Sequence, residues 1–147
     1  MLCFVIEKQQ LTVGCRKVKM SKKILIIDDD RELAELFGGF LQTFGYPPPC
    51  YAGDGREGLF RLERDESISL VITDLEMPNL NGQEFINACR NLYPDKKIIL
   101  MSGEFFPDDD LIATAKRYSA DAVLPKPFLP HKVLDALTIA GVSPKMF

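Results

Sequence analysis

The chain has 147 residues, of which 46% are hydrophobic and 27% are charged. This composition is typical of one globular domain and excludes a wholly disordered chain. The net charge of −3 is unevenly placed, because residues 1–23 sum to +5 and the other residues to −8. An acidic body argues against direct binding of nucleic acid. No apolar run approaches the roughly 18 residues of a membrane-spanning helix, so we expect no membrane association.

Residues 1–20 have neither a helical nor a strand period. We expect them to be a poorly ordered N-terminal extension, with residues 21–147 as the folded domain; a small added strand or helix is the alternative. The apolar run at residues 1–6 has no basic residue before it, which makes a poor signal peptide. The four cysteines form no CxxC pair, so we expect reduced thiols and a cytoplasmic location.

Short apolar runs alternate with amphipathic stretches from residue 24 onward. The runs suit strands buried on both faces and lie at 24–27, 70–72, 98–101 and 122–124. One continuous helical face is formed by Leu33, Leu36, Phe37, Phe40, Leu41 and Phe44. Further helices are predicted at about 56–65, 83–93, 109–118 and 131–140. This alternation predicts right-handed βαβ crossovers and a parallel sheet covered on both faces.

Two segments fit this pattern less well. Residues 47–49 are three prolines directly before Cys50–Ala52, and they remove three hydrogen-bond donors, so a strand here must be short and lie at the sheet edge. Gly38 and Gly39 lie inside the first predicted helix, where each costs about 1 kcal/mol relative to alanine. Close packing is the explanation that we expect for this pair.

Polar side chains follow four of the predicted strands at the point where each strand ends. Residues 28–30 are three aspartates after the first apolar run, and Asp74, Ser102 and Lys126 follow later runs. Taken singly, the aspartates can cap a helix or turn, the serine can be a turn residue and the lysine can be solvated. Ligands of open parallel sheets bind at the carboxyl ends of the strands, so the four positions together indicate a functional site.

These residue types favour phosphoryl-transfer chemistry. If the first and third strands are neighbours, Asp28, Asp29 and Asp74 converge, and two carboxylates about 5 Å apart repel by roughly 3 kcal/mol. Such a cluster either raises a pKa or binds a cation, and Mg²⁺ suits all-oxygen ligands. Lys126 can pair with Asp74 or a phosphoryl group, and the Ser102 hydroxyl can donate to a phosphoryl oxygen.

Four stretches together resemble the receiver domain of two-component response regulators, of the chemotaxis-regulator type: residues 24–30, 71–82, 101–103 and 124–128. The resemblance covers about residues 21–141. Its most specific parts are the Asp-x-x-Met-Pro-x-x-x-Gly pattern from Asp74 to Gly82 and the Lys-Pro-Phe pattern that starts at Lys126. The resemblance implies an α/β fold, with a doubly wound, five-stranded parallel sheet of flavodoxin-like order 2-1-3-4-5 and five helices.

The resemblance also implies a role for each site residue. Asp74 matches the phosphoacceptor, which takes a phosphoryl group from the phosphohistidine of a histidine kinase or a histidine phosphotransfer protein. Mg²⁺ would be bound by Asp29, Asp74 and the backbone carbonyl of Glu76, with Asp28 acting indirectly. Such a domain is not an enzyme in the ordinary sense, because it catalyses only its own phosphorylation and dephosphorylation.

Ser102 and Lys126 match the residues that bind the phosphoryl group and transmit the switch. The Lys126–Pro127 peptide bond matches one that is usually cis in the family. Val123 stands where the family often has an aromatic switch residue, so we expect the signal to depend on Ser102 and on residues 103–107. Phe105 or Phe106 would supply the missing aromatic ring. The output face would comprise the fourth helix, the fifth strand and the fifth helix, and would contact a downstream protein.

Two alternatives remain at this stage. The chain can be an interaction module with a receiver fold that is never phosphorylated. Less favoured is a phosphatase of the haloacid dehalogenase type, which would place the nucleophile after the first strand, at Asp28, and leave the Met77-Pro78 pair unexplained. No output domain follows residue 147 in this sequence, which fits either a stand-alone receiver or one cut from a larger protein.

Overall fold

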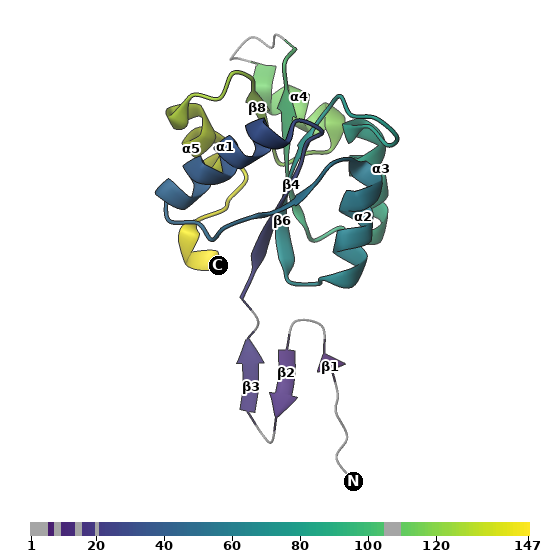
Figure 1. The fold of residues 1–147 in the computed structure, drawn as a ribbon, viewed down its shortest axis with the longest axis vertical. Helices are drawn as coiled ribbons and strands as arrows, with labels where there is room; N and C mark the ends of the chain where they lie inside the picture. Colours follow the sequence, from purple (N-terminus) through teal and green to yellow (C-terminus); the bar gives the residue numbers. More distant parts are fainter. Residues whose placement is uncertain (1–5, 8–9, 14–15, 20, 105–109) are drawn as a thin grey trace.

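The computed structural model describes residues 6–7, 10–13, 16–19, 21–104 and 110–147. A small antiparallel sheet comes first and consists of β1 (Ile6–Glu7), β2 (Gln10–Val13) and β3 (Arg16–Lys19). Figure 1 shows it apart from the larger sheet, before the start of β4. The assignment of residues 1–20 to an extension outside the domain stays a prediction.

The larger sheet has five parallel strands in the order β5-β4-β6-β7-β8. They are β4 (Lys23–Ile27), β5 (Cys50–Ala52), β6 (Ile68–Asp74), β7 (Lys97–Ser102) and β8 (Ala122–Pro125). Numbered within this sheet, the order is 2-1-3-4-5, as predicted. The prediction of a short edge strand after the three prolines is also confirmed, because β5 has three residues and pairs only with β4 among the described strands.

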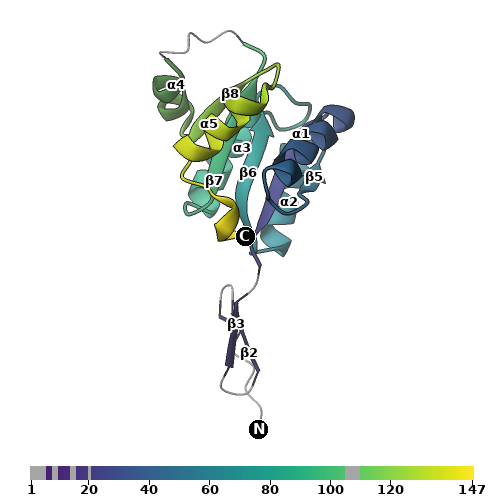
Figure 2. The same cartoon turned by 90° about the vertical axis from the view of Figure 1, so that its left-hand side faces the viewer.

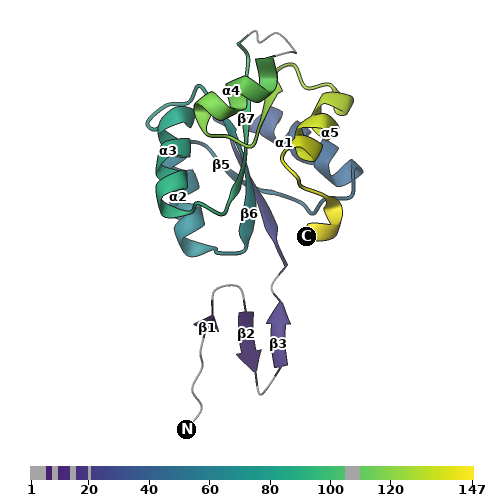
Figure 3. The same cartoon turned by 180° about the vertical axis from the view of Figure 1, so that it is seen from behind.

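Helices cover both faces of this sheet. They are α1 (Arg31–Thr43), α2 (Gly55–Arg64), α3 (Gly82–Leu92), α4 (Leu111–Tyr118) and α5 (Pro130–Ile139), with a short 3-10 turn at Pro144–Met146. Helices α1 and α5 lie on one face, and α2, α3 and α4 lie on the other (Figures 2 and 3). None of the helices in the described part of the chain has the length and apolar character needed to cross a membrane.

The alternation of side chains along each strand builds two cores. In β4, Ile24 and Ile26 pack with α1 and α5, whereas Leu25 and Ile27 pack with α2 and α3. All four side chains have no exposed surface. A continuous apolar run is therefore expected for a strand such as β4, whose side chains are buried on both faces of the sheet.

The two glycines of α1 have different surroundings. A Cβ atom on Gly38 would lie 2.2 Å from the hydroxyl oxygen of Tyr51 and 3.0 Å from Pro49, whereas one on Gly39 would meet nothing within 4 Å. The Tyr51 ring is in turn stacked under the Arg31 guanidinium, 4.2 Å from the ring centroid. Close packing therefore explains Gly38 but not Gly39.

This difference predicts opposite effects of two matched substitutions. Gly39→Ala is expected to raise the free energy of unfolding by about 1 kcal/mol, the difference in helix propensity. Gly38→Ala is expected to lower it, because the new methyl group must displace Tyr51 and Pro49. Urea unfolding followed by circular dichroism measures both. Equal stabilisation by the two variants would contradict this account of α1.

Candidate functional site

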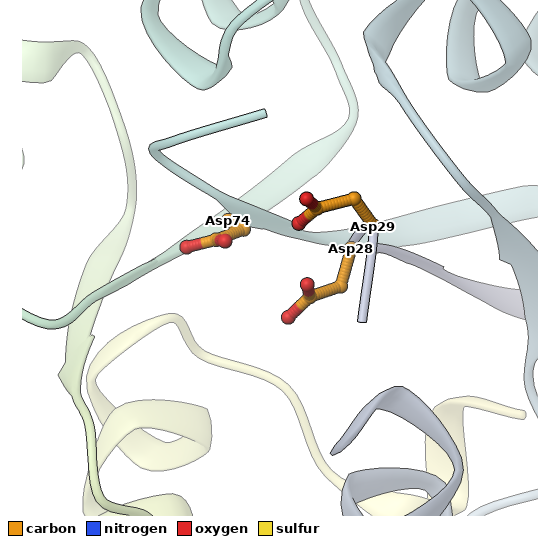
Figure 4. A group of neighbouring side chains, drawn as sticks. All are labelled: Asp28, Asp29 and Asp74. Carbon is orange, nitrogen blue, oxygen red and sulfur yellow. The ribbon is translucent and has the colours of Figure 1, made fainter. Parts of the chain in front are cut away.

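The three aspartates predicted to converge lie together in the structure. Asp28 and Asp29 directly follow β4, and Asp74 is the last residue of β6. Because β4 and β6 are neighbours, with Ile27 paired to Thr73, their carboxyl ends lie at the same edge of the sheet. One carboxylate oxygen from each aspartate lies within 4.8 Å of the other two (Figure 4). This site lies at the carboxyl ends of the strands, where ligands of such sheets bind.

Lys126, the residue directly after β8, joins this cluster. Its Nζ atom lies 3.3 Å from Oδ2 of Asp28 and 3.2 Å from Oδ1 of Asp74. The other oxygen of Asp28 accepts a hydrogen bond of 2.9 Å from the backbone N–H of Asp30. Both oxygens of Asp28 are thus engaged by protein donors, whereas Asp29 is exposed and lines an open cleft.

Burial governs the protonation of the cluster. It raises the pKa of the Asp74 carboxyl above its ordinary value, although the charge of Lys126 acts in the opposite direction. Burial also raises the pKa of Asp28, against the hydrogen bond from Asp30 and the charge of Lys126. For Lys126, burial works against the charged form, but Asp28 and Asp74 outweigh it and raise the pKa of the ammonium. The site is therefore short of positive charge.

Ser102 closes the other side of the cleft, at the end of β7. It is buried, and its hydroxyl oxygen accepts a 3.1 Å hydrogen bond from the backbone N–H of Glu104. Its carbonyl oxygen accepts a 2.8 Å bond from the backbone N–H of Lys126, which ties the ends of β7 and β8 together. The cleft measures about 500 Å³ and is lined by Asp29, Asp74, Leu75, Glu76, Ser102, Gly103, Glu104 and Lys126.

The backbone around Asp74 leaves no room for a side chain at Gly82. A Cβ atom there would lie 2.3 Å from the carbonyl oxygen of Asp74 and 2.8 Å from Cα of Leu75. The backbone N–H of Leu75 donates to Oδ1 of Asp74 at 2.9 Å and to the carbonyl of Met101 at 3.0 Å. The glycine of the Asp-x-x-Met-Pro-x-x-x-Gly pattern is therefore required by close approach to the residue that opens the pattern.

The donor set of the cluster suits a hard divalent cation. Three carboxylates converge and face one lysine, so each ionised pair repels, and a bound cation relieves that repulsion. Oxygen ligands with space for waters are those that Mg²⁺ prefers. The residues present thus fit an ion at this position, beside the ammonium of Lys126.

The side chains predicted for the site lie together in the structure: Asp28, Asp29, Asp74, Ser102 and Lys126. Asp30 lies outside the cluster and caps α1, since its side chain accepts a 3.1 Å bond from the backbone N–H of Leu33. The Lys126–Pro127 peptide bond is cis. Glu104, predicted to belong to the signalling segment 103–107, also lines the cleft, which the sequence did not indicate. Phe105 and Phe106, proposed as aromatic reporters, lie outside the described residues.

Comparison with known proteins identifies the same family that the sequence motifs resemble. A family model described as the response regulator receiver domain matches residues 24–138. The chain is 31% identical over 115 residues to the probable chemotaxis protein CheY of Rhizobium etli, covering 78% of this chain and 88% of that protein. A solved structure of the chemotaxis response regulator CheY4 of Vibrio cholerae has a TM-score of 0.69 and 29% identity, covering 82% of this chain and 99% of that one.

Other relatives are longer. The response regulator protein FleR of Pseudomonas aeruginosa is 32% identical over 116 residues, a match that covers 79% of this chain and 24% of FleR. The chain spans less than half the length of several relatives that it matches. The matched residues include the whole carboxylate cluster and Lys126. The chain therefore belongs to the response regulator receiver domain family.

Proposed function

We propose that this chain is a phosphoacceptor of a two-component signalling system, with Asp74 as the residue that receives the phosphoryl group. The observation that carries the proposal is the position of Asp74, at a strand end beside two further aspartates and paired to Lys126. Membership of the receiver family supports it. In this proposal residues 21–147 form the receiver, in the cytoplasm, and residues 1–20 are an extension.

The proposed reaction transfers a phosphoryl group from a phosphohistidine of a histidine kinase or histidine phosphotransfer protein. A carboxylate oxygen of Asp74 attacks phosphorus, the O–P bond forms, and the P–N bond breaks. The electron pair of that bond stays with the imidazole nitrogen. Lys126 and the Ser102 hydroxyl are the protein groups suited to stabilise the charged phosphoryl oxygens, because both line the cleft beside Asp74.

Mg²⁺ is the cofactor in this proposal. Asp29, Asp74 and the backbone carbonyl of Glu76 would hold it, and Asp28 would act indirectly by orienting Lys126. When bound, the ion supplies positive charge that neutralises phosphoryl oxygens during transfer. The downstream partner would bind the surface formed by α4, β8 and α5, which adjoins the strand ends at which Ser102 and Lys126 lie.

The proposal is tested by incubating the protein with acetyl phosphate and Mg²⁺ and measuring its intact mass. The wild-type chain is expected to gain one phosphoryl group, and Asp74→Asn is expected to gain none. Asp95→Asn, a change at an exposed aspartate in the α3–β7 turn, serves as the matched control and should behave as wild type. Removal of Mg²⁺ with EDTA should prevent the gain.

Two results would contradict the proposal. A wild-type chain that remains unmodified, both with acetyl phosphate and with a phosphorylated histidine phosphotransfer protein, would indicate an interaction module that is not phosphorylated. A phosphoryl group located on Asp28 by peptide mass mapping would instead indicate haloacid-dehalogenase-type chemistry.

A further inference from the structure

The loop between β6 and α3, residues 75–81, is tied to the beginning of α2. The Nδ2 atom of Asn79 donates a 2.7 Å hydrogen bond to Oδ2 of Asp54. The backbone N–H of Gly55 donates a 3.2 Å bond to the carbonyl of Leu80. A Cβ atom on Gly55 would lie 2.6 Å from that same carbonyl oxygen, so the two backbones are in close contact. The loop that carries Glu76 is therefore fastened to a neighbouring helix.

The beginning of α2 is itself held firmly. The Oδ1 atom of Asp54 caps the helix by accepting a 2.9 Å bond from the backbone N–H of Glu57, and the Glu57 carboxylate accepts a 2.7 Å bond from the N–H of Gly53. One turn later, a Cβ atom on Gly58 would lie 2.4 Å from Cδ1 of Ile27. Helix α2 is thus packed tightly on β4, the strand that leads directly into Asp28 and Asp29.

Asn79 also sets the path of the loop. Its φ angle is +64°, in the left-handed region that asparagine tolerates better than most residues. Downstream, the backbone N–H of Gly82 closes the loop with a 2.9 Å bond to the carbonyl of Leu75. Glu76 lies between these two fastened points and lines the cleft beside Asp74.

We infer that Asp54 and Asn79 are positioning residues of the metal site: their hydrogen bond holds the β6–α3 loop where the Glu76 carbonyl can serve as a Mg²⁺ ligand. This inference rests on the proposed function. Asp54 and Asn79 act through the loop and are not ligands themselves. The burial of Asp74 fixes one end of the loop, and the contact with α2 fixes its middle.

Three variants separate this role from a simple change of charge. Asp54→Ser keeps a capping hydroxyl for α2 but loses the oxygen that Asn79 binds, and it removes one negative charge. Asn79→Asp sets two carboxylates against each other and adds one negative charge. The double variant D54N/N79D restores one hydrogen-bond donor and one acceptor at the original net charge. Its intact mass is measured to verify that the side-chain amide introduced at position 54 has not hydrolysed to a carboxylate.

Mg²⁺ titration followed by NMR of the loop amides measures the dissociation constant of each variant. D54S and N79D are both expected to weaken Mg²⁺ binding by about threefold to tenfold, the range that one hydrogen bond accounts for. D54N/N79D is expected to recover most of the loss. A pure charge effect would instead move D54S and N79D in opposite directions. Amide exchange of Leu75 and Gly82, measured without metal, should accelerate in both single variants and return in the double variant.

The controls keep failure of the inference distinct from failure of the proposed function. Asn87→Asp adds a charge on α3 away from the loop and should not weaken Mg²⁺ binding, whereas Asp29→Ala should remove most of it. If the wild type binds Mg²⁺ and N79D binds it equally well with unchanged amide exchange, the inference is overturned. A wild type that does not bind Mg²⁺ at all would overturn the metal site itself.

Discussion

Lys126→Met is expected to lower the free energy of unfolding by about 3 kcal/mol at pH 7 in the absence of divalent cations, the lower end of the range for breaking a buried ion pair. The ammonium of Lys126 lies within 3.3 Å of both Asp28 and Asp74. The Asp28 side chain is only 1% exposed, so water cannot replace the lost charge there. The substitution therefore leaves two buried carboxylates beside the exposed Asp29 with no cation to pair them.

The pH dependence of this loss follows from the pKa of each group. Burial raises the pKa of Asp28 and Asp74 in the folded protein, so the folded state holds their protons more tightly than the unfolded chain does. Stability then falls as the pH rises from the ordinary carboxyl pKa through the raised value. Lys126 limits that rise, so its removal enlarges it. The deficit of Lys126→Met should be largest at neutral pH and should shrink as the pH falls toward 4.

Ionised Lys126 stabilises the folded state, whereas ionised Asp28 and Asp74 destabilise it. The pKa of Lys126 is raised above the ordinary 10.5, so its stabilising contribution is fully present below that pH and is lost as the pH rises through the raised value. At alkaline pH the wild type should therefore lose stability, and the difference in free energy of unfolding between wild type and Lys126→Met should become smaller. Added Mg²⁺ should recover part of the stability of the variant, because a bound cation replaces the missing positive charge.

Urea unfolding at pH 5 and pH 7, with and without Mg²⁺, measures these differences. Lys23→Met is the matched control, since it breaks the Lys23–Asp65 pair, whose side chains are 53% and 31% exposed. An exposed pair of this kind contributes at most about 1 kcal/mol. Equal losses of stability for the two lysine variants, or a loss for Lys126→Met that does not depend on pH, would show that Lys126 does not relieve repulsion between the buried carboxylates.

The sheet and the clustering of the three aspartates were predictable because both depend on strong local patterns. A strand buried on both faces must be a continuous apolar run, and the run at residues 24–27 ends where the first aspartate begins. The three prolines at 47–49 left only an edge position for β5. Once β4 and β6 are neighbours, the positions of Asp28, Asp29 and Asp74 follow from where the strands end.

Contacts between loops were not predictable, because no period or composition encodes them. The Asn79–Asp54 hydrogen bond joins residues 25 positions apart in two turns, and it depends on a left-handed backbone angle at Asn79. Nothing in the sequence distinguishes the adjacent glycines Gly38 and Gly39, yet only Gly38 lies against the side chain of Tyr51. Glu104 lines the same cleft as Asp74, and its backbone N–H donates a 3.1 Å hydrogen bond to the hydroxyl oxygen of Ser102, a contact that no sequence period indicates.

Under the proposed function, the signal from a phosphoryl group on Asp74 to the surface formed by α4, β8 and α5 is expected to run through Ser102 and not through Val123. A phosphoryl group on Asp74 adds about two negative charges and three acceptor oxygens, and the Ser102 hydroxyl is a donor on the same cleft. In the structure that hydroxyl oxygen accepts from Glu104, so turning toward a phosphoryl group would alter the chain after β7. Val123 lies in β8, paired with Leu100 and 4% exposed, and valine is stiff at its first side-chain dihedral angle.

Two variants test this route by hydrogen exchange before and after treatment with acetyl phosphate and Mg²⁺. Ser102→Ala is expected to accept the phosphoryl group, as read by intact mass, but to lose most of the change in exchange over α4, β8 and α5. Val123→Ala is expected to keep that change, although the lost buried methyl groups lower stability by about 2 kcal/mol. Both variants are compared well below their unfolding midpoints. If Val123→Ala abolished the change and Ser102→Ala preserved it, the signal would run through the packing of β8. A change confined to α1 and α2 would place the output on a different surface. The surface of α4, β8 and α5 is the expected one because the backbone bond from Lys126 to Ser102 joins the ends of β7 and β8, the strands that precede α4 and α5 in the chain.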